Sequence, residues 1–220
     1  MYTLCMSVRK IKKSYISCTG YFASLKNKKP IPFESVLERD FYMHLEFDKN
    51  VRVYDSQPFR IKYEMEGRKT RYTPDVLVEY NDGSKKVFEV KYSKEIEESI
   101  YLQNKLNTLK IEINNKMKLE LEIFTDNDID ENYLVNAKFL YKFAFLSEDL
   151  NYSLEIRKKL KETSLPISVQ SILNEFSFDK EVQLKYIPFI WMEVFKNISL
   201  INMNIKLSMK TQILRRNYNE

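Results

Sequence analysis

Residues 72–92 read YTPDVLVEYNDGSKKVFEVKY and hold the clearest structural pattern in this chain of 220 residues. The segments 71–80 and 85–92 are rich in β-branched and aromatic residues, which favour strands. Between them, Asn81-Asp82-Gly83 is a strong signal for a tight turn. The stretch therefore predicts an antiparallel hairpin with strands over 71–80 and 85–92.

Three polar side chains in this hairpin form the pattern Pro-Asp, thirteen residues, Glu-x-Lys. Residues two apart on a strand share a face, so Glu89 and Lys91 project together. The register set by the turn places Asp75 opposite residues 89–91. A Glu-x-Lys pair alone is more often an exposed ion pair worth under about 1 kcal/mol. The added Asp75 instead favours a site in which two carboxylates and an ammonium converge.

That set of groups suits metal-assisted hydrolysis of a phosphodiester. Mg²⁺ prefers carboxylate oxygens, so we expect Asp75 and Glu89 to be ligands, with one or two Mg²⁺ ions and Mn²⁺ as a substitute. Lys91 would orient or deprotonate the attacking water. Glu38, on a preceding helix, is the expected third metal ligand and catalytic acid, and Glu34 and Glu46 are its competitors.

The flanking segments predict a mixed sheet with helices on its faces, an α/β fold. Leu37, Phe41 and Leu45 recur every four residues and predict an amphipathic helix over 34–46. The remaining elements that the patterns predict are strands over 51–54, 59–63 and 119–124 and helices over 94–117, 130–145, 167–176 and 182–194.

Composition excludes several other chemistries. The chain has three glycines, one histidine and two cysteines. The glycines are too scattered for a phosphate-binding loop, and the thiols are too few for a disulfide framework or a four-thiolate metal site. The apolar run 186–192 is far shorter than the roughly 20 residues of a membrane helix. We therefore expect a cytoplasmic bacterial protein without membrane contact.

Charge and pattern divide the chain into three predicted parts. Residues 1–30 contain seven basic residues and no acidic one, and form a basic arm. Residues 31–148 form the predicted nuclease domain, and residues 149–220 a helical module, with a winged helix as one alternative, for contact with DNA or a partner. The residues expected to contact DNA are Arg9, Lys10, Lys12, Lys13, Lys26, Lys28, Lys29, Arg215 and Arg216.

Several motifs together resemble TnsA, the endonuclease subunit of heteromeric cut-and-paste transposases. They are the helical run 33–48, Gln57-Pro58, Tyr72-Thr73-Pro74-Asp75 and Glu89-Val90-Lys91, and the resemblance extends over residues from about 20 to 145. It implies a restriction-endonuclease-like fold of the PD-(D/E)xK type, with Glu38, Asp75, Glu89 and Lys91 as catalytic residues.

The resemblance also implies a division of labour. This chain would nick the 5′ ends of a transposon, and a TnsB-like recombinase and a TnsC-like AAA+ ATPase regulator would be its partners. Two alternatives stay open at this point. One is a stand-alone restriction or repair nuclease of the same fold, and the other is a catalytically degenerate adaptor bound to DNA.

Overall fold

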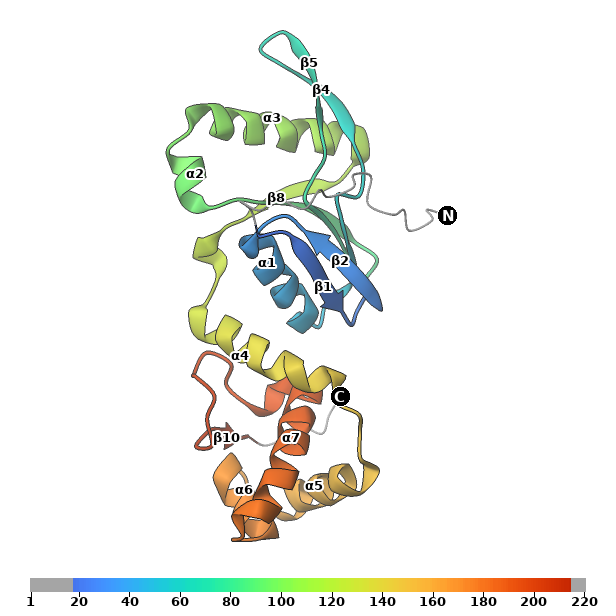
Figure 1. The fold of residues 1–220 in the computed structure, drawn as a ribbon. Helices are drawn as coiled ribbons and strands as arrows, with labels where there is room; N and C mark the ends of the chain where they lie inside the picture. Colours follow the sequence, from blue (N-terminus) through green and yellow to red (C-terminus); the bar gives the residue numbers. More distant parts are fainter. Residues whose placement is uncertain (1–17, 215–220) are drawn as a thin grey trace. The chain divides into compact units, whose positions relative to one another are not determined.

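The computed structural model describes residues 18–214. The chain forms two compact units that divide between Ile129 and Asp130 (Figure 1). The predicted limit of the nuclease domain, at residue 148, lies inside the second unit. The segment 130–148 belongs to the same compact unit as the C-terminal residues.

The first unit is built around a four-stranded mixed sheet with the order β3-β6-β7-β8. Neighbouring strands are antiparallel except β7 and β8, which are parallel. The mixed α/β architecture is as predicted. Its elements in chain order are β1 (Gly20–Ser24), β2 (Lys29–Phe33), α1 (Val36–Phe47), β3 (Val51–Ser56), β4 (Ile61–Met65), β5 (Arg68–Tyr72), β6 (Val76–Tyr80), β7 (Lys85–Val90), α2 (Ser93–Glu97), α3 (Ile100–Met117), β8 (Glu120–Phe124) and the 3-10 helix η1 (Asp126–Asp128).

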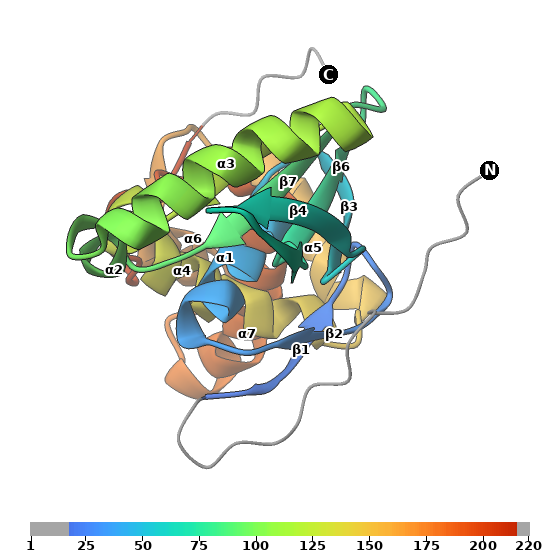
Figure 2. The same cartoon turned by 90° about the horizontal axis from the view of Figure 1, so that it is seen from above.

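Helices cover both faces of this sheet. On one face Phe41 of α1 packs against Phe88 of β7 and Phe124 of β8, with ring centroids 5.0 and 4.4 Å apart. On the other face Leu109 and Ile113 of α3 join a core that also includes residues of β4, β5, β7 and β8. Figures 1 and 2 show α3 and α1 on opposite sides of the sheet. Alternation along β7 therefore places Phe88 and Glu89 in different layers.

The predicted strand over 71–80 is wrong in one respect, because it is two strands in two sheets. β5 ends at Tyr72 and pairs with β4, whereas β6 starts at Val76 and joins the main sheet. Pro74 lies in the gap, where it lacks an N–H for a ladder and restricts the residue before it. Pro74 and Asp75 therefore lie in the short link between the two sheets.

The predicted helix over 94–117 is likewise two helices, α2 and α3. Ser99 separates them and caps the second, since its hydroxyl accepts a hydrogen bond of 3.1 Å from Leu102 N. Serine competes well for such free N–H groups at a helix start. The apolar periodicity continued across this break, so it did not reveal the cap.

The end of the predicted basic arm forms a second hairpin, β1–β2, which the sequence did not indicate. Glu46 of α1 holds its turn, accepting hydrogen bonds from Ser24 Oγ at 2.5 Å and from Leu25 N at 3.2 Å. It also accepts from Lys26 N and from Tyr54 Oη. The Glu46 carboxylate, which is half-buried, thus joins α1 to the β1–β2 hairpin and to β3.

The second unit is helical, as predicted. Its elements are α4 (Glu131–Tyr141), η2 (Lys142–Phe145), α5 (Leu150–Glu162), β9 (Ile167–Ser168), α6 (Val169–Phe176), α7 (Lys180–Lys196), η3 (Ile198–Leu200) and β10 (Gln212–Ile213). Helix α5 is absent from the predicted elements; Asp149, which precedes it, is its N-cap. Trp191 is buried in this unit, with its ring 5.1 Å from that of Phe139. None of the helices between residues 18 and 214 is both long and apolar enough to span a membrane.

Candidate active site

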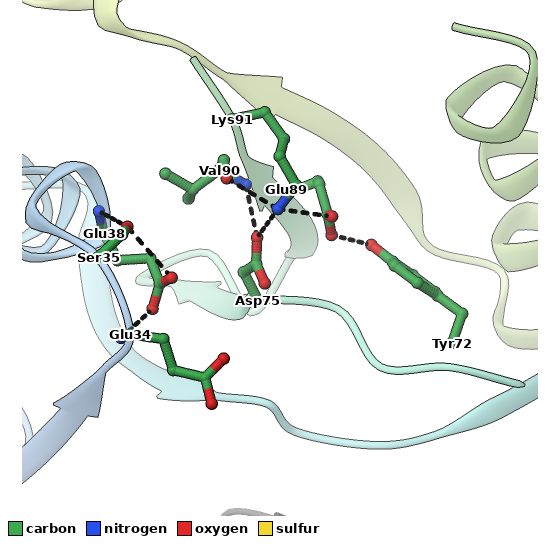
Figure 3. A network of polar contacts seen from close by, with 8 residues as sticks. All are labelled: Glu34, Ser35, Glu38, Tyr72, Asp75, Glu89, Val90 and Lys91. Atoms are coloured by element: carbon green, nitrogen blue, oxygen red, sulfur yellow. Dashed lines mark hydrogen bonds and ion pairs between the residues drawn. The ribbon is translucent and has the colours of Figure 1, made fainter. Parts of the chain in front are cut away.

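Three polar side chains meet where β6 begins and β7 ends (Figure 3). Lys91 Nζ lies 3.1 Å from Glu89 Oε1 and 3.5 Å from Asp75 Oδ2. The same nitrogen donates a hydrogen bond of 3.2 Å to the Val90 carbonyl. Glu89 is buried, whereas the Lys91 side chain is 29% exposed, so the cluster opens to solvent on the lysine side. The predicted convergence of Asp75, Glu89 and Lys91 is thus present.

Backbone contacts hold Asp75 in this place. Val76 pairs with Phe88 across the hairpin, so the residue before Val76 falls beside the end of β7. Val90 N donates a hydrogen bond of 2.8 Å to Asp75 Oδ2. The Asp75 carbonyl accepts one of 2.8 Å from Gln57 N, where Gln57 has a φ of 48°. Both the side chain and the main chain of Asp75 are therefore fixed from neighbouring strands.

Burial and mutual repulsion change the acidity of the cluster. Burial and then the nearby Glu89 carboxylate raise the pKa of Asp75 to about 7, against the opposing effect of Lys91. Burial lowers the pKa of Lys91, but the attraction of Asp75 and Glu89 outweighs it and leaves that pKa above its usual value. At neutral pH the lysine is therefore charged, while Asp75 is close to its titration point.

Glu38 comes from α1, in the layer opposite to Glu89. Its carboxylate accepts hydrogen bonds from Glu34 N at 2.9 Å and from Ser35 Oγ at 3.2 Å, at the start of the helix. Burial raises the pKa of Glu38, and its charge in turn raises the pKa of Asp75. Glu38 is thus an electrostatic neighbour of the cluster, but its oxygens face the helix start.

The two competitors of Glu38 differ in position. The Glu46 carboxylate accepts hydrogen bonds from the β1–β2 turn, so it has a structural role that needs no metal. The Glu34 carboxylate points away from Lys91 (Figure 3). The geometry therefore leaves Glu38 as the better candidate of the three for a third acid.

The fit of Mg²⁺ to this site rests on two carboxylates. Within residues 18–214 no group of three or more His, Cys, Asp or Glu side chains is arranged to hold a metal ion. The predicted three-carboxylate set of Glu38, Asp75 and Glu89 is therefore not assembled. Mg²⁺ commonly binds through one or two carboxylates and keeps several waters, so Asp75 and Glu89 are a chemically suitable pair.

Tyr72 is a site residue that the sequence did not single out. It is the last residue of β5, and its buried hydroxyl donates a short hydrogen bond to Glu89 Oε2. Burial and the Glu89 charge both raise the pKa of Tyr72. A buried tyrosine hydroxyl needs a polar partner, and that rule, applied to the Tyr-Thr-Pro-Asp run, could have suggested this contact.

The residues predicted to contact DNA fall into two groups. Arg9, Lys10, Lys12, Lys13, Arg215 and Arg216 lie outside the described residues. Lys28 and Lys29 are exposed at the β1–β2 turn, and Lys29 lies 3.9 Å from Asp55. Lys26 differs, because its ammonium donates to the carbonyls of Asp48, at 2.7 Å, and Val51. Lys26 therefore has an internal structural role and is not among the DNA contacts proposed below.

The first unit is thus a mixed sheet in which an aspartate, a glutamate and a lysine converge at the end of a hairpin. Residues 48–131 match the model of the family described as TnsA-like endonuclease N terminal. This part of the chain is a TnsA-like endonuclease N-terminal domain, in agreement with the resemblance. The matched segment contains Asp75, Glu89 and Lys91 and begins after Glu38. No curated protein matches the chain.

Proposed function

We propose that this protein is a Mg²⁺-dependent DNA endonuclease that nicks the 5′ ends of a transposon. The observation that carries the proposal is the meeting of Asp75, Glu89 and Lys91 inside the segment that matches the endonuclease family. The catalytic set is Asp75, Glu89 and Lys91, with Glu38 as a third acid that would have to leave its contacts at the helix start.

Each side chain has a distinct role in this proposal. Asp75 and Glu89 would hold Mg²⁺, which when bound would lower the pKa of a water molecule and offset phosphate charge. The charged state of Lys91 favours orienting the attacking water and stabilising negative charge on the phosphate over removal of a proton. Tyr72 positions the Glu89 carboxylate.

The proposal extends to partners. A TnsB-like recombinase would cleave and join the 3′ ends, and a TnsC-like ATPase would regulate both subunits. The helical second unit is the part that we assign to contact with DNA or with that regulator. Arg9, Lys10, Lys12, Lys13, Lys28, Lys29, Arg215 and Arg216 are the proposed DNA contacts outside the catalytic cluster.

The experiment is strand-specific nicking of a transposon-end duplex by the chain together with the recombinase and ATPase of its element. Wild type should nick the 5′ ends with Mg²⁺, and Asp75→Asn should not. The matched control is Asp82→Asn in the same β6–β7 hairpin, because Asp82 is exposed and, among residues 18–214, its side chain bonds only to Ser84 in its own turn. Asp82→Asn should cut like wild type.

Two outcomes would contradict the proposal. Retained 5′ nicking by folded Asp75→Asn would remove Asp75 from the site. Efficient double-strand cutting by the chain alone, without either partner, would favour the stand-alone nuclease instead. A circular dichroism spectrum and a melting curve for each variant establish that the folded protein is being compared.

A further inference from the structure

The β4–β5 hairpin has one strongly basic face. In the observed register Lys62 pairs with Arg71 and Glu64 with Lys69, and all four side chains are exposed on the same face. Arg60 and Arg68, at the base and the tip, are exposed as well. Residues 59–73 thus carry five basic and two acidic side chains, inside a middle region that is acidic overall. We call residues 59–73 the basic hairpin.

The arrangement of these charges is unfavourable for the fold. Lys62 and Arg71 lie directly opposite each other on neighbouring strands, where like charges destabilise a sheet. Within the described residues, Lys62, Lys69 and Arg71 form no ion pair with an acidic side chain, although Glu64 is the cross-strand neighbour of Lys69. The Lys62–Arg71 pair does not stabilise the two-stranded ribbon. The basic face is therefore better explained by binding of an anionic ligand.

The hairpin is firmly mounted beside the active site. Its inner residues Ile61, Tyr63 and Tyr72 belong to the core formed with α3 and the main sheet. Lys116 of α3 donates a hydrogen bond of 2.6 Å to the Lys62 carbonyl. At its base, Tyr72 bonds to Glu89, and the chain runs on to Asp75. Figure 1 shows the tip of the hairpin extending past α3.

We propose that the outer face of the basic hairpin, Lys62, Lys69 and Arg71 with Arg60 at its base, binds the phosphate backbone of duplex DNA. A rigid ribbon bearing cations at regular intervals can contact successive phosphates, which positions the duplex without reading its sequence. Because the hairpin base is bonded to Glu89, a bound duplex would be held with one phosphate near Asp75 and Glu89. This inference rests on the proposed function and names the surface that holds its substrate.

The test measures binding without cleavage, so it is independent of whether the protein cuts DNA. A fluorescein-labelled, random-sequence duplex is titrated with the full chain in EDTA, and anisotropy is followed over a range of salt concentrations. For Lys62→Ala with Arg71→Ala we expect about a ten- to hundredfold weaker affinity at about 0.1 M salt, and a salt slope smaller by about 2. Removing the opposed like charges should leave the melting temperature unchanged or higher.

The matched control removes the same charge elsewhere in the first unit. Lys94 and Lys110 are exposed lysines outside the hairpin, so Lys94→Ala with Lys110→Ala changes the net charge equally. This control should shift affinity by less than about threefold. If the hairpin variant binds like wild type, or if both double variants lose affinity equally, the hairpin is not the DNA contact and a protein partner becomes the better explanation of its charge. Weakened DNA binding together with no nicking by wild type would leave the hairpin assignment standing and overturn the proposed function.

Discussion

Asp75 illustrates how a single residue can be chosen for chemistry at the expense of stability. Its carboxylate is largely shielded from water and lies close to the Glu89 carboxylate, and its pKa is raised to about 7. Without a metal, the folded protein therefore disfavours the charged form of Asp75. A carboxylate in this condition is ready to bind a cation, because binding relieves the repulsion that folding creates.

This strain predicts how stability depends on pH. The folded pKa lies above the unfolded value, so the contribution of Asp75 to stability is complete below about pH 4 and is lost as the pH rises through about 7. Asp75→Asn should therefore be as stable as wild type near pH 4 and more stable, by about 2 to 4 kcal/mol, above about pH 8. Chemical denaturation in EDTA at a series of pH values measures this difference. A constant difference at every pH would show that Asp75 is not strained.

Loss of the Tyr72 hydroxyl should affect the same site differently, because it should weaken Mg²⁺ binding and leave the stability of the fold unchanged. Tyr72→Phe keeps the buried ring but removes the hydroxyl that holds Glu89. We expect the Mg²⁺ concentration needed for half-maximal nicking to rise about 10- to 100-fold, as for other residues that orient a metal ligand. The control is Tyr63→Phe, a buried tyrosine of the same core cluster with no hydrogen bond to Glu89. Equal Mg²⁺ requirements for the two variants would make Tyr72 purely structural.

At the scale of elements, helix α1 carries two acidic residues with separate tasks. Glu46, near the helix end, joins α1 to the β1–β2 turn and to Tyr54 through four hydrogen bonds. Glu38, near the helix start, accepts hydrogen bonds from Glu34 N and Ser35 Oγ, and its charge raises the pKa of Asp75. The sequence offered both as metal ligands because both are acidic residues of the helix that precedes the sheet.

Substitution of each residue separates these tasks. Glu46→Ala should lower the free energy of unfolding by about 3 kcal/mol, because four hydrogen-bond donors, two of them on the buried residues Ser24 and Tyr54, lose their acceptor. Glu38→Ala should cost about 1 kcal/mol, the worth of a helix-start contact, and should impair Mg²⁺-dependent nicking. Unfolding curves and metal titrations of nicking give both quantities. If Glu46→Ala lost metal response while keeping its stability, the assignment would be reversed.

At the scale of the whole molecule, the division into units assigns α4 to the C-terminal part. Ala137 and Leu140 of α4 are fully buried, and α4 contacts α7. Asn136 donates to the carbonyls of Met203 and Ile205 and accepts from Leu207 N. These contacts tie α4 to residues near the end of the described chain.

Truncation distinguishes this boundary from the one predicted by sequence. A chain ending at Ile129 should stay soluble and melt cooperatively, because the first unit has its own core. A chain ending at residue 148 keeps α4 without α7 and exposes its apolar face, so we expect aggregation and binding of a hydrophobic dye. Size-exclusion chromatography and dye fluorescence compare the two. The opposite order of behaviour would restore the boundary at 148.

Local sequence patterns predicted helix α1, the strands of the main sheet and the central part of the site. The turn 81–83 sets the register of β6 and β7, and that register alone brings Asp75 to the end of β7. Alternation then places Glu89 and Lys91 on one face. These relations need only neighbouring strands, so they can be read from the chain.

The tertiary structure decided which groups have partners across layers. Glu38 comes from α1, on the face of the sheet opposite to Glu89, and Tyr72 reaches Glu89 from a separate two-stranded sheet. The end of the first unit also depends on α4 packing with α7. Such contacts join residues far apart along the chain, and a sequence pattern records the face of an element but not what packs against it.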